Sequence, residues 1–226
     1  MCDDTEGQAD IAWRNGDVPV SRRFDDPYFS LEDGLAETAH VFLDGNRLPD
    51  RFTDGFHVAE LGFGTGLNLL AALALWRNNG TAGVLRYTSF EAYPMAPPQL
   101  MRAQAAFPAL ALLAAELAPH WGRDEIILSD LRFRLVTGDA RETLPRWGGA
   151  ADAWFLDGFS PARNPELWEP ALMSEVYAHT KPRGTVATYT AAGGVRRGLA
   201  AAGFEVTRSP GYGRKRHMTR AVKGPA

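Results

Sequence analysis

The 226-residue chain is 45% hydrophobic and 23% charged, which excludes a disordered chain, and its net charge of -3 argues against indiscriminate binding to nucleic acid. The single cysteine, Cys2, excludes an intrachain disulfide and a cysteine-based zinc site. The longest nearly continuous apolar run, Leu67 to Trp76, is about half the length that crosses a bilayer, and the N-terminus lacks the basic start of a signal peptide. We therefore expect a globular cytoplasmic protein without a metal or a membrane segment.

Residues 1 to 54 are predicted to form an extension ahead of the main sheet. Short strand-like runs flank Asn15-Gly16, a pattern typical of a β-hairpin with a tight turn. The following stretch, Ser21 to Asp54, is rich in aromatic and acidic residues and shows only a short helical pattern around Leu31 to Phe42. We interpret this extension as a decoration on one structural unit, in which residues 55 to 226 form the main domain.

From Phe56 onward, short apolar strands alternate with longer helical stretches. The predicted strands are Phe56 to Leu61, Leu85 to Glu91, Arg132 to Thr137, Ala151 to Leu156, Gly184 to Tyr189, Phe204 to Ser209 and Lys215 to Val222. The predicted helices are Gly66 to Asn78, Pro97 to Ala118, Ala140 to Arg146, Pro165 to His179 and Gly193 to Ala202. The alternation indicates parallel strands joined by crossover helices, and the short turn before the last strand predicts that it runs antiparallel beside its predecessor. A mostly parallel seven-stranded sheet with a reversed last strand is the Rossmann-like α/β fold of class I methyltransferases.

The first strand ends in a glycine-rich loop that reads Glu60-Leu61-Gly62-Phe63-Gly64-Thr65-Gly66. Glycines at every second position let a ligand lie against the main chain at a helix N-terminus, although such a loop is also found as a simple tight turn. Dinucleotide-binding loops favour G-x-G-x-x-G, whereas the spacing here is G-x-G-x-G. Glu60 would repel a pyrophosphate but not the cationic, phosphate-free S-adenosylmethionine. The loop therefore predicts an S-adenosylmethionine site that includes Glu60, Gly62, Phe63, Gly64 and Gly66.

Two further strands end in carboxylates. Glu91 lies 25 residues after Gly66, about where a dinucleotide fold places the acid that accepts the ribose hydroxyls. Asp139 follows the third strand and is suited to accept a hydrogen bond from an adenine amino group. Taken alone, Glu91 is also compatible with a surface glutamate at a strand end. Because parallel strands end at one edge of the sheet, we predict that both contact the donor.

Residues 154 to 165, WFLDGFSPARNP, predict a buried strand that delivers Asp157 to the same edge, followed by a stiff loop. A carboxylate beside the donor can orient an amine and receive its proton, so we predict that Asp157 contacts the donor and is catalytic. Its alternative role is a helix cap or a loop brace. Phe159 is expected to stack on a flat substrate or to anchor the loop by packing, and Arg163 and Asn164 offer polar contacts to a substrate.

The two ends of the chain carry opposite charges. Residues 1 to 60 contain 5 basic and 14 acidic side chains, whereas residues 191 to 226 contain 8 basic and 1 acidic. A basic segment of this kind either lies along a phosphate backbone or forms an ordinary solvated face.

Several motifs, taken in order, resemble one family. They are DDPYFS, VFLDGNRLPDRF, ELGFGTGLN, SFE, WFLDGFSPARNP, the stretch from Thr190 to Gly203 with VRRGL, and GYGRKRHM. Nearly the whole chain resembles the tRNA 5-(aminomethyl)-2-thiouridylate methyltransferases, which occur as the N-terminal domain of bifunctional MnmC enzymes and as the stand-alone MnmD type.

The resemblance implies methylation of the aminomethyl group on the wobble uridine, with the tRNA anticodon loop as partner and S-adenosylmethionine as donor. It assigns Asp157 to the acceptor amine and the basic residues Arg196, Arg197, Arg214, Lys215 and Arg216 to the RNA. Because the chain ends shortly after the basic motif, we expect no flavin-binding domain and no FAD. No obligate protein partner is indicated.

Three other functions remain compatible with the residues alone. The nearest is a methyl- or aminopropyl-transferase that acts on a small amine or another nucleic acid, and the basic C-terminal segment argues against a polyamine. An NAD-linked oxidoreductase is disfavoured by the glycine spacing, and a silent RNA-binding subunit is disfavoured by Asp157.

Overall fold

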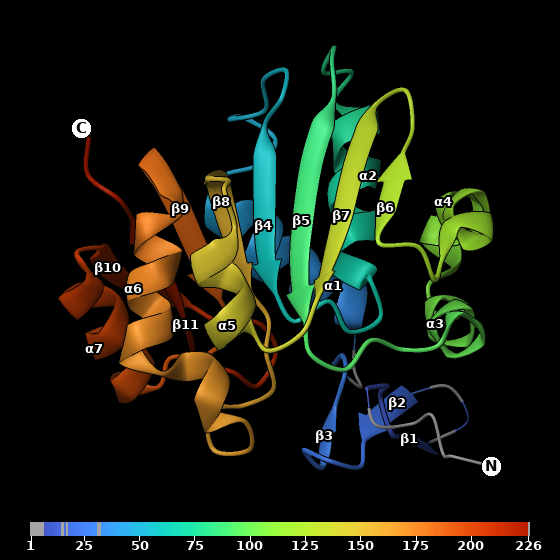
Figure 1. Cartoon of the computed structure of the whole chain (residues 1–226), viewed down its shortest axis with the longest axis horizontal. Helices are drawn as coiled ribbons and strands as arrows, with labels where there is room; N and C mark the ends of the chain where they lie inside the picture. Colours follow the sequence, from blue (N-terminus) through green and yellow to red (C-terminus); the bar gives the residue numbers. More distant parts are fainter. Residues whose placement is uncertain (1–6, 15, 17, 31–32, 226) are drawn as a thin grey trace.

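The computed structural model describes residues 7–14, 16, 18–30 and 33–225, and its centre is an eight-stranded sheet in the order β10-β11-β9-β8-β4-β5-β7-β6 (Figure 1). The strands are β4 (His57–Leu61), β5 (Leu85–Glu91), β6 (Glu125–Ile127), β7 (Leu131–Thr137), β8 (Ala151–Leu156), β9 (Thr180–Thr188), β10 (Glu205–Pro210) and β11 (His217–Val222). All seven predicted strands are present, which confirms the class of fold. The predicted number is wrong by one, because β6 is only three residues long and buries only Ile126, too little to show an alternating pattern.

The pairing of the strands brings five carboxyl ends to one edge of the sheet. β4 runs parallel to β5 and β8, β5 runs parallel to β7, and β8 runs parallel to β9. β11 is antiparallel to β10 and to β9, which confirms the predicted reversal of the last strand beside its predecessor. The loops that follow β4, β5, β7 and β8 are therefore neighbours, as open α/β sheets require of a ligand site.

Two of the predicted helices are broken by proline. The main helices are α2 (Leu67–Asn78), α3 (Pro97–Gln104), α4 (Ala111–Leu117), α5 (Ala140–Thr143), α6 (Pro170–Ala178) and α7 (Gly193–Ala202). The predicted helix from Pro97 to Ala118 breaks at Phe107, and that from Pro165 to His179 breaks at Glu169, each of which precedes a proline and has a non-helical backbone. A proline ring excludes the helical conformation from the residue before it, so each predicted helix divides into two.

Helices cover both faces of the sheet and form two hydrophobic cores. One core joins the sheet to α2, α3 and α4 and includes Tyr87, Phe155 and Trp76. The other joins the opposite face to α5, α6 and α7, with Trp154 and Met173 fully buried. Successive strand residues alternate between the cores, as Trp154 and Phe155 do, because a strand points neighbouring side chains to opposite faces. Such burial on both faces holds the strand ends rigidly in place.

The N-terminal residues form a small sheet of β1 (Ile11–Arg14), β2 (Val18–Ser21) and β3 (Asp26–Pro27). The antiparallel β1–β2 pair confirms the predicted hairpin, although Asn15 of its turn lies outside the described residues. Figure 1 shows this sheet beneath the carboxyl ends of the central strands. The predicted helix around Leu31 to Phe42 is present as α1 (Gly34–Thr38) and a π-helical turn, Ala39–Leu43, while Leu31 lies outside the described residues.

Among the described residues, no single helix has the length and apolar composition to cross a membrane. The bent pair Pro97–Gln104 and Pro108–His120 passes that test only when its two parts are taken together.

Candidate active site

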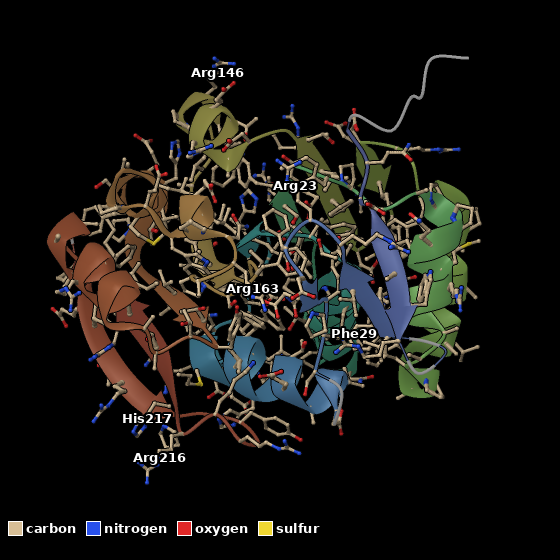
Figure 2. The ribbon with its side chains drawn as sticks, turned by 90° about the horizontal axis from the view of Figure 1, so that it is seen from below. Arg23, Phe29, Arg146, Arg163, Arg216 and His217 are labelled. Atoms are coloured by element: carbon tan, nitrogen blue, oxygen red, sulfur yellow. The ribbon has the colours of Figure 1, made fainter. Side chains whose placement is uncertain are left out.

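A cavity of about 680 Å³ opens where the loops after β4, β5, β7 and β8 meet the N-terminal extension. Figure 2 looks onto this edge of the molecule, with Arg23, Phe29 and Arg163 near the centre of the view. Of the residues predicted to bind the donor or the substrate, those lining the cavity are Gly62, Phe63, Gly64, Glu91, Asp139, Asp157, Phe159, Arg163, Asn164 and Lys215. The structure thus gathers most of the predicted site into one place.

The glycine loop approaches the segment after β8 too closely for any side chain. Gly62 has a φ of +90°, and a Cβ there would lie 2.5 Å from the carbonyl oxygen of Asp157. The loop is fixed on both sides, since the Gly62 amide donates to the carbonyl of Phe90 and the Asp157 amide donates to that of Leu61, both at 2.9 Å. Only glycine satisfies these two requirements.

The other loop residues have different positions. Phe63 lines the cavity but is also buried against Phe133, with ring centroids 5.3 Å apart. Gly66 has a φ of +70° and precedes α2, outside the lining of the cavity. Two of the five predicted loop residues, Gly66 and Glu60, therefore do not face the ligand space.

Glu60 lies beneath the loop. Its side chain is fully buried, where Asn68 donates to Oε1 at 2.8 Å and Ser89 donates to Oε2 at 2.7 Å. Burial raises the pKa of Glu60 to about 8, which these hydrogen bonds oppose only in part. Glu60 is therefore mostly protonated at neutral pH and braces the loop from inside the protein.

Glu91 and Asp139 are the carboxylates on the far side of the loop. Glu91 accepts hydrogen bonds from the amides of Gly64, at 3.1 Å, and Tyr93, at 2.9 Å, so it holds the glycine loop as well as facing the cavity. Asp139 caps α5 by accepting from the amide of Arg141 and pairs with the Arg141 guanidinium at 2.7 Å. Hydrogen bonding by Arg141 lowers the pKa of Asp139, so Asp139 stays ionised.

Asp157 lines the cavity together with the glycine loop and residues of the N-terminal extension. It is half-buried at the end of β8, and Asn68 Nδ2 donates to its Oδ2 at 2.7 Å. Burial raises the pKa of Asp157 to about 7, Glu37 raises it further, and Asn68 and Lys215 lower it. A carboxylate with this pKa is a stronger proton acceptor than an ordinary aspartate and is still substantially ionised at neutral pH.

The loop after Asp157 is held by the N-terminal extension. The ring of Phe159 stacks on Phe24 at 4.9 Å and meets the edge of Tyr28 at 4.9 Å. Ser160 donates its amide to Asp26 at 3.0 Å, and Arg163 pairs with Asp25 at 2.8 Å. Phe159 therefore anchors the loop by packing, which is one of its two expected roles. Its ring also lines the cavity.

The predicted RNA-binding residues do not form one patch around the cavity. Lys215 lines it, where its ammonium pairs with Glu37 at 2.6 Å and lies 4.1 Å from the ring centre of Tyr189. Arg214 and Arg216 are exposed in the β10–β11 turn, and Figure 2 shows Arg216 at the periphery of the face that carries Arg163 near its centre. Arg196 and Arg197 lie on α7, outside the cavity lining.

Sequence reasoning missed several residues that line the cavity. Many of them come from the extension, among them Asp26, Tyr28, Glu37 and Thr38, and their contacts are non-local. Asn68 also lines the cavity, and it could have been found from the sequence, because it is a polar amide in the otherwise apolar run that follows the glycine loop. Within the described residues, no three His, Cys, Asp or Glu side chains are grouped to hold a metal ion.

Comparison with known proteins now identifies the class. A family model described as S-adenosyl-L-methionine-dependent methyltransferase matches residues 109–224. The solved structure of MNMC2 from Aquifex aeolicus superimposes with a TM-score of 0.77 at 27% identity, covering 98% of this chain and 72% of that one. Fold, cavity and family model together define a class I S-adenosylmethionine-dependent methyltransferase, and they give no support to the oxidoreductase alternative.

Two curated relatives narrow the family. The chain is 46% identical over 223 residues to the tRNA 5-methylaminomethyl-2-thiouridine biosynthesis bifunctional protein MnmC of Pseudomonas aeruginosa (strain UCBPP-PA14), covering 93% of this chain and 34% of that protein. It is 45% identical over 227 residues to the MnmC protein of Caulobacter sp. (strain K31), covering 94% of this chain and 38% of that protein. This chain belongs to the family of the MnmC methyltransferase domain and spans about a third of the length of these relatives.

Proposed function

We propose that this chain methylates the amine of 5-aminomethyluridine, with or without a 2-thio group, at the wobble position of tRNA, forming the 5-methylaminomethyl derivative. The observation that carries the proposal is the match to MnmC proteins over 93% of the chain. The position of Asp157 in the cavity supports an amine as acceptor. The tRNA, its anticodon loop and a cytoplasmic location are part of this proposal.

The cavity suits S-adenosylmethionine in shape and charge. Gly62 and Gly64 leave the backbone open to close approach, and the cavity is large enough for an adenosyl ligand together with part of a substrate. The carboxylates of Glu91, Asp139 and Asp157 favour a cation without phosphate groups. In the proposal, Glu91 binds the ribose, Asp139 the adenine amino group, and Gly62, Phe63 and Gly64 the rest of the donor.

The bound donor supplies an electrophilic methyl group on a positively charged sulfur. The acceptor is an aliphatic amine, which carries a proton at neutral pH and must lose it before its lone pair can attack. The Asp157 carboxylate accepts a hydrogen bond from this amine, orients the lone pair and receives the proton. Asn68 keeps Asp157 in place by donating to it, and the walls formed by Phe159 and Tyr28 exclude water from the amine.

The RNA is proposed to approach the edge of the sheet that Figure 2 shows. Arg163 and Asn164 lie at the cavity and would contact the nucleotide, whereas Arg214 and Arg216 would contact the phosphate backbone farther out. An aminomethyl group within a folded anticodon loop reaches a cavity of this kind most easily if the wobble base is turned out of the stack. The basic residues of α7, Arg196 and Arg197, are assigned to the RNA by family resemblance alone.

The proposal is tested with labelled donor and tRNA that carries aminomethyluridine. Wild-type protein should transfer one methyl group to this tRNA and none to the same tRNA with an unmodified wobble base. Asp157→Ala should bind the donor with near-normal affinity and lose roughly 100-fold or more in rate, the range typical of a lost acid–base group. Donor binding without any transfer to this tRNA, or preferential transfer to a small polyamine, would refute the proposed substrate.

A further inference from the structure

We infer that Asn68 is the positioning residue for Asp157, and that Thr38 of the N-terminal extension holds Asn68 in the orientation that this task requires. Asn68 is the second residue of α2, and both Asn68 and Thr38 are buried. The Thr38 hydroxyl donates to Asn68 Oδ1 at 2.9 Å. The Asn68 amide nitrogen donates to Glu60 Oε1 at 2.8 Å and to Asp157 Oδ2 at 2.7 Å.

These contacts use both N–H donors of the Asn68 amide and one of the two acceptor positions of its oxygen. An asparagine amide has two N–H donors, and both are directed at carboxyl oxygens here. Were the amide rotated by half a turn, its oxygen would face Asp157 and Glu60 and leave the Asp157 carboxylate without this donor. The Asp157 carboxylate can only accept and therefore opposes that rotation, while the Thr38 hydroxyl gives the buried amide oxygen a donor in the orientation that the structure shows.

The extension thereby becomes part of the active site. Thr38 is the last residue of α1 and lies 30 positions before Asn68 in the chain. It belongs to the N-terminal extension, which the sequence analysis interprets as a decoration on the main domain. Its hydroxyl bonds to Asn68 and not to Asp157, so it affects the reaction only through Asn68. Thr38 is therefore a positioning residue rather than a catalytic one.

Other charged and titratable groups also face Asp157. Glu60 and Tyr87 come from β4 and β5, Glu37 from α1, Tyr189 from the end of β9, and Lys215 from the β10–β11 turn. Among the hydrogen bonds between described side chains, the bond from Asn68 is the one that holds the Asp157 carboxyl group. Loss of this bond should raise the pKa of Asp157 and make the carboxylate form scarcer at neutral pH.

The test compares Thr38→Val, Thr38→Ser and Asn68→Ala with the wild type. Valine has the shape of threonine without the hydroxyl, whereas serine retains the hydroxyl. Thr180→Val is the matched control, because Thr180 is an equally buried threonine whose hydroxyl donates to the carbonyl of Val176 and which does not line the cavity. The readouts are the titration of the Asp157 carboxyl carbon by NMR, the pH profile of kcat and the affinity for the donor.

Thr38→Val and Asn68→Ala should raise the pKa of Asp157 by about one unit, which corresponds to about tenfold less carboxylate well below that pKa. Because one pKa unit is a tenfold change in the protonation equilibrium, the acid limb of the kcat profile should move by the same amount. The affinity for the donor should stay within about twofold of wild type. Thr38→Ser and Thr180→Val should titrate like the wild type. Unchanged titration in Thr38→Val and Asn68→Ala, or an equal shift in Thr180→Val, would overturn the inference.

The catalytic part of this inference rests on the proposed function, but the titration does not. Failure of the wild-type protein to methylate aminomethyluridine in tRNA would refute the proposed substrate. The NMR titration of Asp157 would still decide whether Asn68 and Thr38 position the carboxylate.

Discussion

Replacing Gly62 with alanine places a methyl group where the glycine loop contacts the backbone of Asp157. The added Cβ would lie 2.5 Å from the Asp157 carbonyl oxygen and 3.1 Å from its carbonyl carbon. Ordinary contact begins at 3.4 Å, so one of the two segments must move by about 1 Å. Movement is resisted on both sides by the hydrogen bonds that fix Gly62 to Phe90 and Asp157 to Leu61.

Two energetic effects combine in this variant. Alanine at a φ of +90° costs about 1–2 kcal/mol of backbone strain, and overpacking costs about 1–3 kcal/mol more. In addition, a displacement of about 1 Å at a reacting group can reduce the rate about 100-fold. We therefore expect Gly62→Ala to lose both stability and most of its kcat.

Gly80→Ala separates these effects. Gly80 has a φ of +66° and no atom within 4 Å of an added Cβ, so it carries the backbone strain without the close contact. Thermal unfolding should place the Tm of Gly62→Ala below that of Gly80→Ala by at least about 2 °C, given roughly 2–4 °C per kcal/mol for a chain of this size. Methyl-transfer assays should show near-normal kcat in Gly80→Ala. Equal Tm and equal kcat in the two variants would refute the role of the close contact.

Three further changes test other parts of the site. Glu60→Gln should leave donor affinity within about twofold of wild type in calorimetry, because a buried Glu60 with a pKa of about 8 is already mostly neutral; a large loss would indicate direct contact between Glu60 and the donor. The stability of Asp157→Asn relative to wild type should rise between about pH 4 and pH 7, because folded Asp157, with its raised pKa, holds a proton that the unfolded chain releases earlier. Chemical denaturation over that range measures this difference, and a constant or falling difference would contradict the raised pKa. The double variant Arg214→Glu and Arg216→Glu should weaken tRNA binding and flatten its salt dependence, and binding assays that show neither change would place the RNA surface elsewhere.

The strand ends were predictable from the sequence for a topological reason. Glu91 ends a strand and Asp139 and Asp157 follow one, and parallel pairing brings such ends to one edge whatever the details of packing. Glu60 illustrates the limit of that reasoning. The sequence shows an acid at a strand end, but the donors that receive it, Asn68 and Ser89, are brought to it only by the tertiary fold.

The contribution of the N-terminal extension was not predictable. Its sequence predicts only a hairpin and one short helix, yet Asp26 accepts from Ser160, Tyr28 packs against Phe159, and Thr38 donates to Asn68. Each contact joins residues at least 30 positions apart, and no local pattern encodes such a separation. The broken helices differ in this respect, because Pro108 and Pro170 are visible in the sequence and signal the breaks directly.

Analysis of the product nucleoside shows which atom of the tRNA receives the methyl group. tRNA that carries aminomethyluridine would be incubated with the protein and S-adenosylmethionine, digested to nucleosides and examined by mass spectrometry with fragmentation. We expect one added methyl group on the amine nitrogen of the wobble nucleoside, formed roughly 100-fold more slowly or slower still with Asp157→Ala. A methyl group on the base ring, on the ribose or on another nucleotide would contradict the assignment of Asp157 to an amine acceptor.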